Sequence, residues 1–305
     1  MVILLINIIA LLVLPFLMIG TIKKTKAFWA GRKGVSLLQP FYDFLRLMKK
    51  ESVYSKTTSW IFKFAPVFNF TTVLFASLFV PLISGQAIIN MPFGFIIFSY
   101  VLGLGKFFSL IGAMDTGSSF EGMGASREAC FSTIVEPAFF ILMGSIVALT
   151  KVSTFENLKI ILENAGIYGY LIILLTAFTL FIMLLIEGCR VPVDDPTTHL
   201  ELTMIHEVMV LDNSGADLGL ISWGSAIKMF LFEALIAALI IPHNFPFWIS
   251  SLAFLGMIFL ISIIIGTVEA SIARFRMTHI FEFIFIMSIG ALLVLTLVTY
   301  RIYGN

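Results

Sequence analysis

The sequence predicts an all-α integral membrane protein: a bundle of about eight transmembrane helices with an amphipathic interfacial helix in the first cytoplasmic loop. Of its 305 residues, 59% are hydrophobic and only 12% are charged, and the mean hydropathy is +1.05. Soluble proteins carry about 25% charged residues, so the excess apolar surface must face lipid. A helix needs about 20 apolar residues to cross a bilayer, and eight segments meet that length.

These eight apolar segments follow one another along the whole chain. They cover residues 2–20, 66–84, 92–113, 131–150, 167–186, 226–242, 248–268 and 280–300. We therefore expect residues 1–305 to form a single polytopic membrane domain. No internal repeat is visible, which argues against an ordinary secondary transporter.

The basic residues lie mainly on one side of the predicted bundle. The loops after the first, third, fifth and seventh segments hold ten Lys or Arg in residues 21–65, and then Arg127, Arg190, Arg274 and Arg276. The positive-inside rule places these odd-numbered loops in the cytoplasm and both termini outside the cell membrane. A net charge of +1 with no basic stripe argues against a nucleic-acid partner.

The first loop contains the predicted interfacial helix. One face carries apolar side chains at helical spacing: Leu37, Leu38, Phe41, Leu45 and Met48. The other face carries Asp43, Arg46, Lys49 and Lys50, and Pro40 suits a first-turn position. This pattern is typical of a helix that lies on anionic lipid.

The fifth loop gathers charge next to the bilayer, where charge is costly and so indicates a functional site. Its titratable residues are Glu187, Asp194, Asp195, His199, Glu201, His206 and Glu207, with Arg190 as a counter-charge. Carboxylates and histidines of similar protonation energy can pass a proton stepwise. His199, Thr203 and His206 would share one helical face. The alternatives are an acidic loop that docks a basic partner and a metal site, although no HExxH-type zinc motif is present.

Charges inside the apolar segments are rarer. Glu136 precedes Pro137, which frees a backbone carbonyl, and Glu233 lies near the middle of the sixth segment. Both are candidates for carrying protons into the membrane, together with Lys106 and Lys228. The alternative is an ion pair that fixes helix packing, formed by Glu233 with one of these two lysines. Glu269 and Glu282 lie near segment ends, where snorkelling accounts for them.

Several further residues are candidates for docking a peripheral partner or for structural charge. They are Arg32, Gln39, Asp43, Asp115, Glu121, Arg127, Glu128, Arg190, Arg274 and Arg276. The residues of the third loop could instead line the mouth of a cavity. There Gly112, Gly117, Gly122 and Gly124 would let the backbone turn tightly.

The two cysteines, Cys130 and Cys189, do not form a CxxC pair. Iron–sulfur clusters and structural zinc need larger ligand sets. We expect both cysteines to be small buried hydrophobic residues. The sequence thus predicts no catalytic residue, no bound cofactor and no metal in this chain.

Three cytoplasmic motifs carry a family resemblance. The first reads Gly31-Arg-Lys-Gly-Val-Ser-Leu-Leu-Gln-Pro-Phe-Tyr-Asp43, and the second Asp115-Thr-Gly-Ser-Ser-Phe-Glu-Gly-Met-Gly-Ala-Ser-Arg127-Glu128. The third reads Arg190-Val-Pro-Val-Asp-Asp-Pro-Thr-Thr-His-Leu-Glu201. The chain resembles the eight-helix membrane subunit that respiratory complex I shares with the group 4 energy-converting nickel–iron hydrogenases. In the third motif, complex I has a pattern closer to Arg-x-Pro-Phe-Asp-Leu-Pro-Glu-Ala-Glu, so the hydrogenase branch, as in formate hydrogenlyase, fits better.

The resemblance implies a non-catalytic anchoring and coupling subunit rather than a separate enzyme. Its partners would be the hydrogenase large and small subunits, a ferredoxin-like iron–sulfur subunit and antiporter-like membrane subunits. The nickel–iron centre and iron–sulfur clusters would lie in those partners. Two other functions stay open: the quinone-binding subunit of a complex I-type or sulfur-reducing oxidoreductase, and an independent proton or cation carrier.

Overall fold

The structure is a computed structural model, and it describes residues 2–83, 85–155, 167–195, 204–242 and 246–303. Throughout these ranges the regular secondary structure is helical, with no β-strand. Eight of the helices are long and apolar enough to cross a membrane, as the sequence predicts. The chain is therefore a multi-pass membrane protein.

The helices follow one another along the whole chain. Their bounds are α1 Val2–Trp29, α2 Gln39–Met48, α3 Trp60–Ser77, α4 Gly94–Asp115, α5 Ser119–Thr150, α7 Ile167–Glu187, α8 Gly215–Ile240, α9 Phe247–Ser271 and α10 Met277–Tyr303. A 3-10 helix, Glu207–Val210, precedes α8. All the α-helices except α2 are the candidate spans.

Two spans begin well before the predicted apolar segments. Helix α5 starts at Ser119 rather than at 131, and α8 starts at Gly215 rather than at 226. Their first turns carry the buried acids Glu121 and Asp217. These turns face protein rather than lipid, so they do not need an apolar composition. The predicted third loop thereby shrinks to the short turn between α4 and α5.

The glycines of this region divide accordingly. Gly117 adopts a left-handed conformation with φ of +72° in the turn between α4 and α5, as the prediction of a tight turn requires. Gly112, Gly122 and Gly124 lie inside helices, so a tight turn at these positions is wrong. Gly124 instead allows the segment before α8 to approach, because a Cβ there would lie 2.9 Å from the carbonyl oxygen of Ile205.

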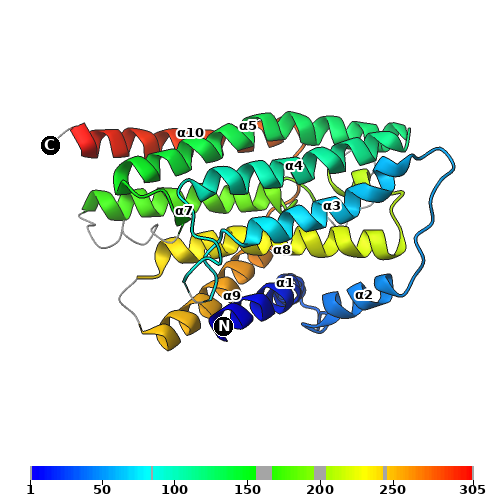
Figure 1. Ribbon diagram of the computed structural model, residues 1–305, viewed down its shortest axis with the longest axis horizontal. Helices are drawn as coiled ribbons and strands as arrows, with labels where there is room; N and C mark the ends of the chain where they lie inside the picture. Colours follow the sequence, from blue (N-terminus) through cyan, green and yellow to red (C-terminus); the bar gives the residue numbers. More distant parts are fainter. Residues whose placement is uncertain (1, 84, 156–166, 196–203, 243–245, 304–305) are drawn as a thin grey trace.

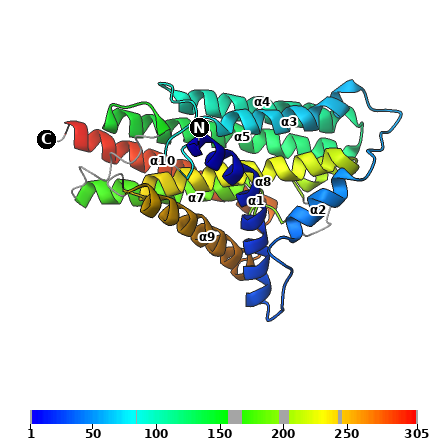
Figure 2. The same ribbon diagram turned by 60° about the horizontal axis from the view of Figure 1, so that its bottom comes forward.

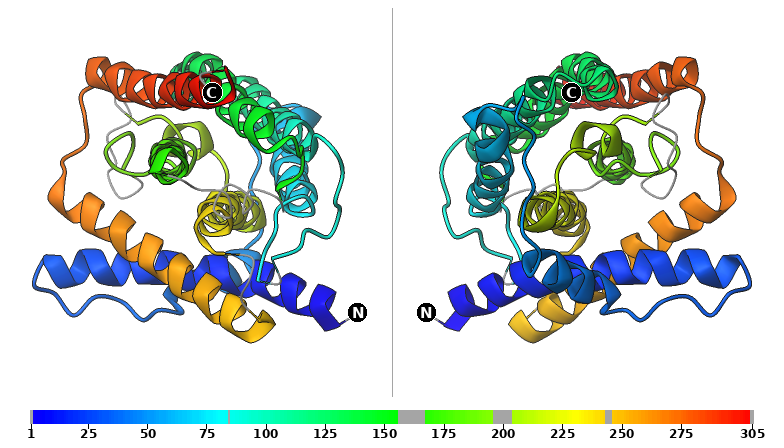
Figure 3. Two further views of the ribbon diagram at one scale, coloured as in Figure 1. Left: turned by 90° about the vertical axis from the view of Figure 1, so that its left-hand side faces the viewer. Right: turned by 90° about the vertical axis from the view of Figure 1, so that its right-hand side faces the viewer.

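Helix α8 runs through the middle of the bundle. Helices α3, α4, α5, α7, α8 and α10 lie roughly along the long axis of the molecule (Figure 1). The other helices surround α8 in the end-on views of Figure 3, and every residue from Ala226 to Leu239 is buried. This position explains why α8 can hold Lys228 and Glu233, because polar groups in spans must face protein rather than lipid.

Helices α1 and α9 cross the bundle obliquely and pack on each other (Figures 2 and 3). Their backbones come close at Gly266, where a Cβ would lie 2.9 Å from the carbonyl oxygen of Ile22. Only a residue without a side chain fits at that distance. The last turns of α1 and α9 therefore lie side by side, where the indole of Trp29 donates to the hydroxyl of Thr267 at 3.2 Å.

Helix α2 has Pro40 in its first turn, as predicted. It packs on α1 and α8 through aromatic contacts: the ring centroids of Phe44 and Trp223 are 4.8 Å apart, and those of Phe41 and Phe16 are 5.4 Å apart. Leu45 and Met48, from the predicted apolar face, stay about 40% exposed. The location of this face at the lipid interface remains a prediction.

Candidate functional site

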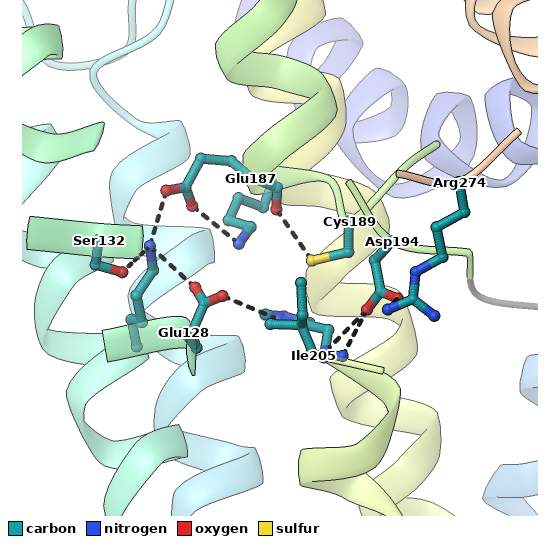
Figure 4. Close-up of polar contacts among 10 residues, drawn as sticks. Glu128, Ser132, Glu187, Cys189, Asp194, Ile205 and Arg274 are labelled. Carbon is teal, nitrogen blue, oxygen red and sulfur yellow. Dashed lines mark hydrogen bonds and ion pairs between the residues drawn. The ribbon is translucent and has the colours of Figure 1, made fainter. Parts of the chain in front are cut away.

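Four charged side chains from four helices meet inside the bundle, and we call them the ion cluster: Lys106, Glu128, Glu187 and Lys228. The ammonium of Lys106 lies 2.7 Å from a Glu187 oxygen and 3.3 Å from a Glu128 oxygen. Lys228 reaches the second oxygen of Glu187 at 3.2 Å. Lys106 also donates to the hydroxyl of Ser132 at 3.0 Å (Figure 4).

The ion cluster is buried and electrically balanced. Its side chains are 8–11% exposed, and two carboxylates face two ammonium groups. From Asp115 at the end of α4, a rise of 1.5 Å per residue places Lys106 about 13 Å inside the helix. Charges at such a depth are tolerated when they pair with one another. The sequence marked all four residues but gave Glu128 a docking role and did not predict the cluster.

His206 adjoins the ion cluster from the segment between α7 and α8. Its Nδ1 lies 3.8 Å from the carboxylate of Glu128. The pKa of His206 lies well above its usual value: burial lowers it, but the neighbouring Cys189 and Glu128 raise it by more. These neighbours therefore favour the protonated form of His206, which extends the row of acidic and basic side chains.

Asp194 fixes the position of His206. Its carboxylate accepts hydrogen bonds from the backbone N–H groups of Ile205 and His206, each at 3.0 Å. The same carboxylate pairs with Arg274 at 3.2 Å (Figure 4). Arg274 was predicted to dock a partner, and Asp194 to carry protons. In the structure the two side chains pair with each other.

Glu136 lies on α5 beside the ion cluster. A small cavity of about 20 Å³ is lined by Glu136, Lys106 and Glu187, among other residues of α4, α5, α7 and α8. A cavity of this size holds about one water molecule. Glu136 is itself only partly buried, so it lies between the cluster and the outer surface of the bundle.

Glu233 does not pair with either lysine, so that packing prediction is wrong. Both lysines pair with Glu187 instead. Glu233 is fully buried, and its oxygens lie 3.4 and 3.5 Å from the hydroxyl of Ser262 on α9. A hydroxyl donor leaves this carboxylate without the opposite charge that a buried acid usually has.

A second ionic group ties α1 to α9. Glu269 pairs with Arg190 at 3.2 Å and with Lys26 at 3.7 Å, and Lys26 lies 3.8 Å from Asp195. The Glu269 side chain is only 3% exposed, so snorkelling does not explain it. Glu282, by contrast, is exposed and pairs with His279 at 2.9 Å. Lys26 was not predicted, because only the crossing of α1 and α9 brings it here.

A larger cavity of about 290 Å³ lies beside this ionic group, and we call it the central cavity. Its charged or reactive lining residues are Lys23, Lys26, Cys189, Arg190, His206, Glu207 and Glu269. Cys189 is partly exposed and Cys130 is exposed, so the prediction that both are buried hydrophobic residues is wrong. The end of α7 places Cys189 at the wall of the cavity.

Most of the residues assigned to the third loop contact other parts of this chain. Asp115 accepts the backbone N–H groups of Ser59 and Phe62 at 2.7 and 3.3 Å, and thereby caps α3. Glu121 accepts the N–H of Asp212 at 3.0 Å. Arg127 donates to the carbonyl of Met204 at 2.8 Å. These contacts give the residues a structural role, and docking remains a prediction for them.

The remaining predicted residues are placed as follows. Gln39 donates to Asp43 at 2.8 Å on α2, and Arg32 and Arg276 are exposed. His199 and Glu201 lie outside the described residues, as does Thr203. A helical face shared by residues 199, 203 and 206 was predicted. Of these, only His206 lies in the described part, and there the prediction is wrong, because residues 204–206 are not helical and are followed by a 3-10 helix. Within the described ranges, no group of three or more His, Cys, Asp or Glu is arranged to hold a metal ion.

Comparisons with known proteins agree with this architecture. The family model described as NADH dehydrogenase matches residues 1–300. Hydrogenase-4 component C of Escherichia coli is 28% identical over 77% of this chain and 73% of its own length. Formate hydrogenlyase subunit 4 of the same organism is 26% identical over 86% of each chain. A subunit of the NADH-quinone oxidoreductase of Anaplasma marginale is 25% identical over 73% of this chain and 68% of its own length.

A solved structure shares the fold. A chain of the membrane-bound sulfane sulfur reductase, an archaeal respiratory membrane complex, superposes with a TM-score of 0.80. The superposition covers 97% of each chain, at 19% sequence identity. The predicted resemblance to hydrogenase and complex I membrane subunits is therefore confirmed.

Proposed function

Because the chain belongs to the NADH dehydrogenase family, we propose that it is the anchoring and coupling subunit of a membrane-bound nickel–iron hydrogenase complex. It docks the peripheral redox arm and links electron transfer there to movement of H⁺ or Na⁺ through the membrane. The names of two relatives, hydrogenase-4 component C and formate hydrogenlyase subunit 4, support the hydrogenase branch. Nickel–iron and iron–sulfur centres would belong to partner subunits.

The observation that carries this proposal is the continuous row of titratable groups around the ion cluster. From the segment before α8, His206 approaches Glu128, and Lys106 joins Glu128 to Glu187. Glu136 shares a water-sized cavity with Lys106 and Glu187. Alternating acids and bases within reach of one another can hand a proton along the row.

The row runs from a solvent-side segment to the membrane-facing surface of α5. In our proposal the odd-numbered loops face the cytoplasm, where the redox arm binds near α2 and the segment 204–214. A change of charge or position in that arm then reaches His206 first. Glu136, at the far end, passes the proton to neighbouring antiporter-like subunits. A reporter fused after residue 305 tests on which side of the membrane the C-terminus lies. We expect a signal from outside the cell, and a signal from the cytoplasm would refute this orientation.

The relay is tested by E136Q in the complete complex, purified and reconstituted in liposomes. Glu136 pairs with no lysine at salt-bridge distance in the described structure, so the neutral isostere should leave assembly intact. We expect electron transfer to continue while the number of ions moved per electron falls at least about tenfold. The control is E282Q, which removes an exposed carboxylate and should change neither quantity.

The outcomes separate coupling from docking. If E136Q moves as many ions per electron as the wild type, Glu136 is not part of the path. A different outcome is possible for E187Q: part of the complexes lose the peripheral arm, and those that keep it move as many ions per electron as the wild type. The charged residues would then serve docking rather than ion movement.

A second candidate function is the quinone-binding subunit of a complex I-type oxidoreductase. The central cavity of about 290 Å³ favours it, because this volume suits a small ring compound. The relative from an NADH-quinone oxidoreductase points the same way. Extraction of the purified complex with organic solvent tests it: stoichiometric quinone, or photolabelling of the cavity wall by a quinone analogue, would favour this candidate over the hydrogenase assignment.

A further inference from the structure

The chain reverses its direction at the end of α1, and we call residues 23–38 the basic turn. The reversal is a Schellman motif: the backbone N–H of Arg32 bonds to the carbonyl of Ala27 at 2.8 Å, and that of Gly31 to the carbonyl of Phe28 at 3.0 Å. Gly31 adopts a φ of +67°, which glycine does without strain. Backbone hydrogen bonds therefore hold the turn, and its side chains are free to contact a partner.

The returning chain packs on the last turns of α1. A Cβ on Gly34 would lie 2.8 Å from the Cβ of Ala27 and 4.0 Å from the Cγ of Lys24. A Cβ on Gly20 would overlap the carbonyl group of Leu37. Only residues without a side chain let the two segments lie so close together. The basic turn is therefore fixed to α1 rather than extended as a free loop.

The basic turn carries positive charge without a compensating acid. It contains five Lys or Arg and no Asp or Glu. One of them, Lys26, pairs with Glu269 and Asp195. The other four are exposed and form no ion pair within the part of the chain that the structure describes: Lys23, Lys24, Arg32 and Lys33. Their counter-charge has to come from outside the chain.

Exposed aromatic side chains accompany these charges. Phe28 is 76% exposed and Trp29 is 60% exposed. The indole of Trp29 donates to Thr267 on α9 at 3.2 Å, so one edge of the ring is held and the rest is open. Figure 2 shows that this end of α1 extends away from the side of the bundle, where lipid surrounds a membrane span. Tryptophan beside lysine and arginine is typical of the interface between membrane and water.

We propose that the basic turn binds the headgroups of anionic phospholipids. The ammonium and guanidinium groups donate to the lipid phosphates, and Phe28 and Trp29 pack among the upper parts of the acyl chains. Lipid fits better than an acidic protein, because these rings need an apolar phase directly beside the charges. Each basic side chain near an anionic membrane strengthens binding about fivefold. This contact is separate from the one predicted for α2, and it does not depend on the proposed ion movement.

The proposal is tested with the full-length chain in nanodiscs of phosphatidylcholine. A dye is attached to S36C, at an exposed position of the basic turn, in a C130S/C189S background. Phosphatidylglycerol or phosphatidylcholine with the same spin-labelled acyl chain then quenches the dye. The ratio of the two quenching constants gives the local preference for the anionic lipid. We expect a ratio of at least about five, which falls in about 1 M salt because the salt screens the charges.

A double variant and a matched control identify the residues. R32Q/K33Q removes two exposed charges and keeps the backbone bonds of the turn, so the ratio should fall to about one. K56Q/K63Q also removes two exposed lysines, from outside the basic turn, and should leave the ratio unchanged. A ratio near one in wild type, or the wild-type ratio in R32Q/K33Q, would overturn the proposal.

Amine acylation separates lipid from an acidic protein partner. The complete complex is stripped of lipid in a neutral detergent, treated with an acylating reagent and analysed by mass spectrometry. We expect Lys24 and Lys33 to react as fast as they do in the isolated chain. Protection of both lysines in the lipid-free complex would mean that a protein covers the basic turn, and the lipid assignment would be wrong.

Discussion

Replacing Lys106 by methionine tests whether the ion cluster holds the bundle together. Lys106 is the ammonium that contacts both carboxylates, at 2.7 and 3.3 Å. In K106M, Glu187 keeps Lys228 at 3.2 Å, but Glu128 keeps only His206 at 3.8 Å. Removing one partner of a buried ion pair costs about 3–5 kcal/mol, mainly because a charge is left buried without compensation. We expect a loss of this size in the free energy of unfolding.

Adding E128Q tests whether the loss of stability in K106M comes from the carboxylate of Glu128. The double variant K106M/E128Q also removes the carboxylate that loses its lysine partner in K106M, and Lys228 still balances Glu187. We expect the double variant to be more stable than the sum of the single effects by about 1–3 kcal/mol, as for residues in direct contact. Unfolding of the purified chain in mixed detergent micelles measures all three variants. The control is K56M, which removes an exposed lysine from the loop before α3.

Two results would refute this reasoning. The first is a loss below about 1 kcal/mol in K106M, which would mean that the carboxylates find water or another cation at no cost. The second is strict additivity of K106M and E128Q, which would mean that the two side chains do not interact in the folded protein.

The remaining predictions concern three other sites. Because the pKa of His206 is raised in the folded protein, its contribution to stability is complete below about pH 6.5 and is lost as the pH rises through the higher folded pKa. The thermal midpoint of wild type should therefore fall toward alkaline pH, whereas that of H206Q should stay flatter; equal slopes would contradict this. G124A should lower the free energy of unfolding by about 1–3 kcal/mol, because the added methyl group overpacks against the segment that holds His206. G122A is the control, because a methyl group there meets open space. It should be neutral or stabilising in the same unfolding assay. E269Q should cost about 3 kcal/mol because it leaves a buried arginine unpaired, and E282Q, at an exposed pair, should leave the midpoint unchanged; equal effects would contradict the assignment.

The fold could be predicted from the sequence because a bilayer imposes a simple length rule. Eight apolar runs correspond to the eight candidate spans. The rule failed at the beginnings of α5 and α8, where Glu121 and Asp217 are buried against connecting segments of the chain instead of facing lipid. Hydropathy measures what lipid tolerates, and it carries no information on polar turns that are buried in protein.

The site could be predicted only as separate residues. Lys106 and Lys228 stood out because charge is rare in apolar segments, and Glu187 because it belongs to the charge gathered in the fifth loop. Their grouping depends on which helices are neighbours, and no spacing within one segment encodes that. Glu269 was misassigned for the same reason: the crossing of α9 with α1, fixed by close packing at Gly266, decides that its carboxylate is buried.

The placement of His206 has a mechanical consequence. The carboxylates and lysines that it faces stand on long, rigid helices, whereas His206 sits on a stretch that is not helical and is fastened by the carboxylate of Asp194. A displacement of the Asp194–Arg274 pair would therefore move the imidazole of His206, while the helices of the bundle keep their positions. A longer distance between His206 and Glu128 than the present 3.8 Å would interrupt the row of titratable groups. In the proposed relay, a small displacement at this edge of the chain would therefore stop proton transfer without a rearrangement of the helices.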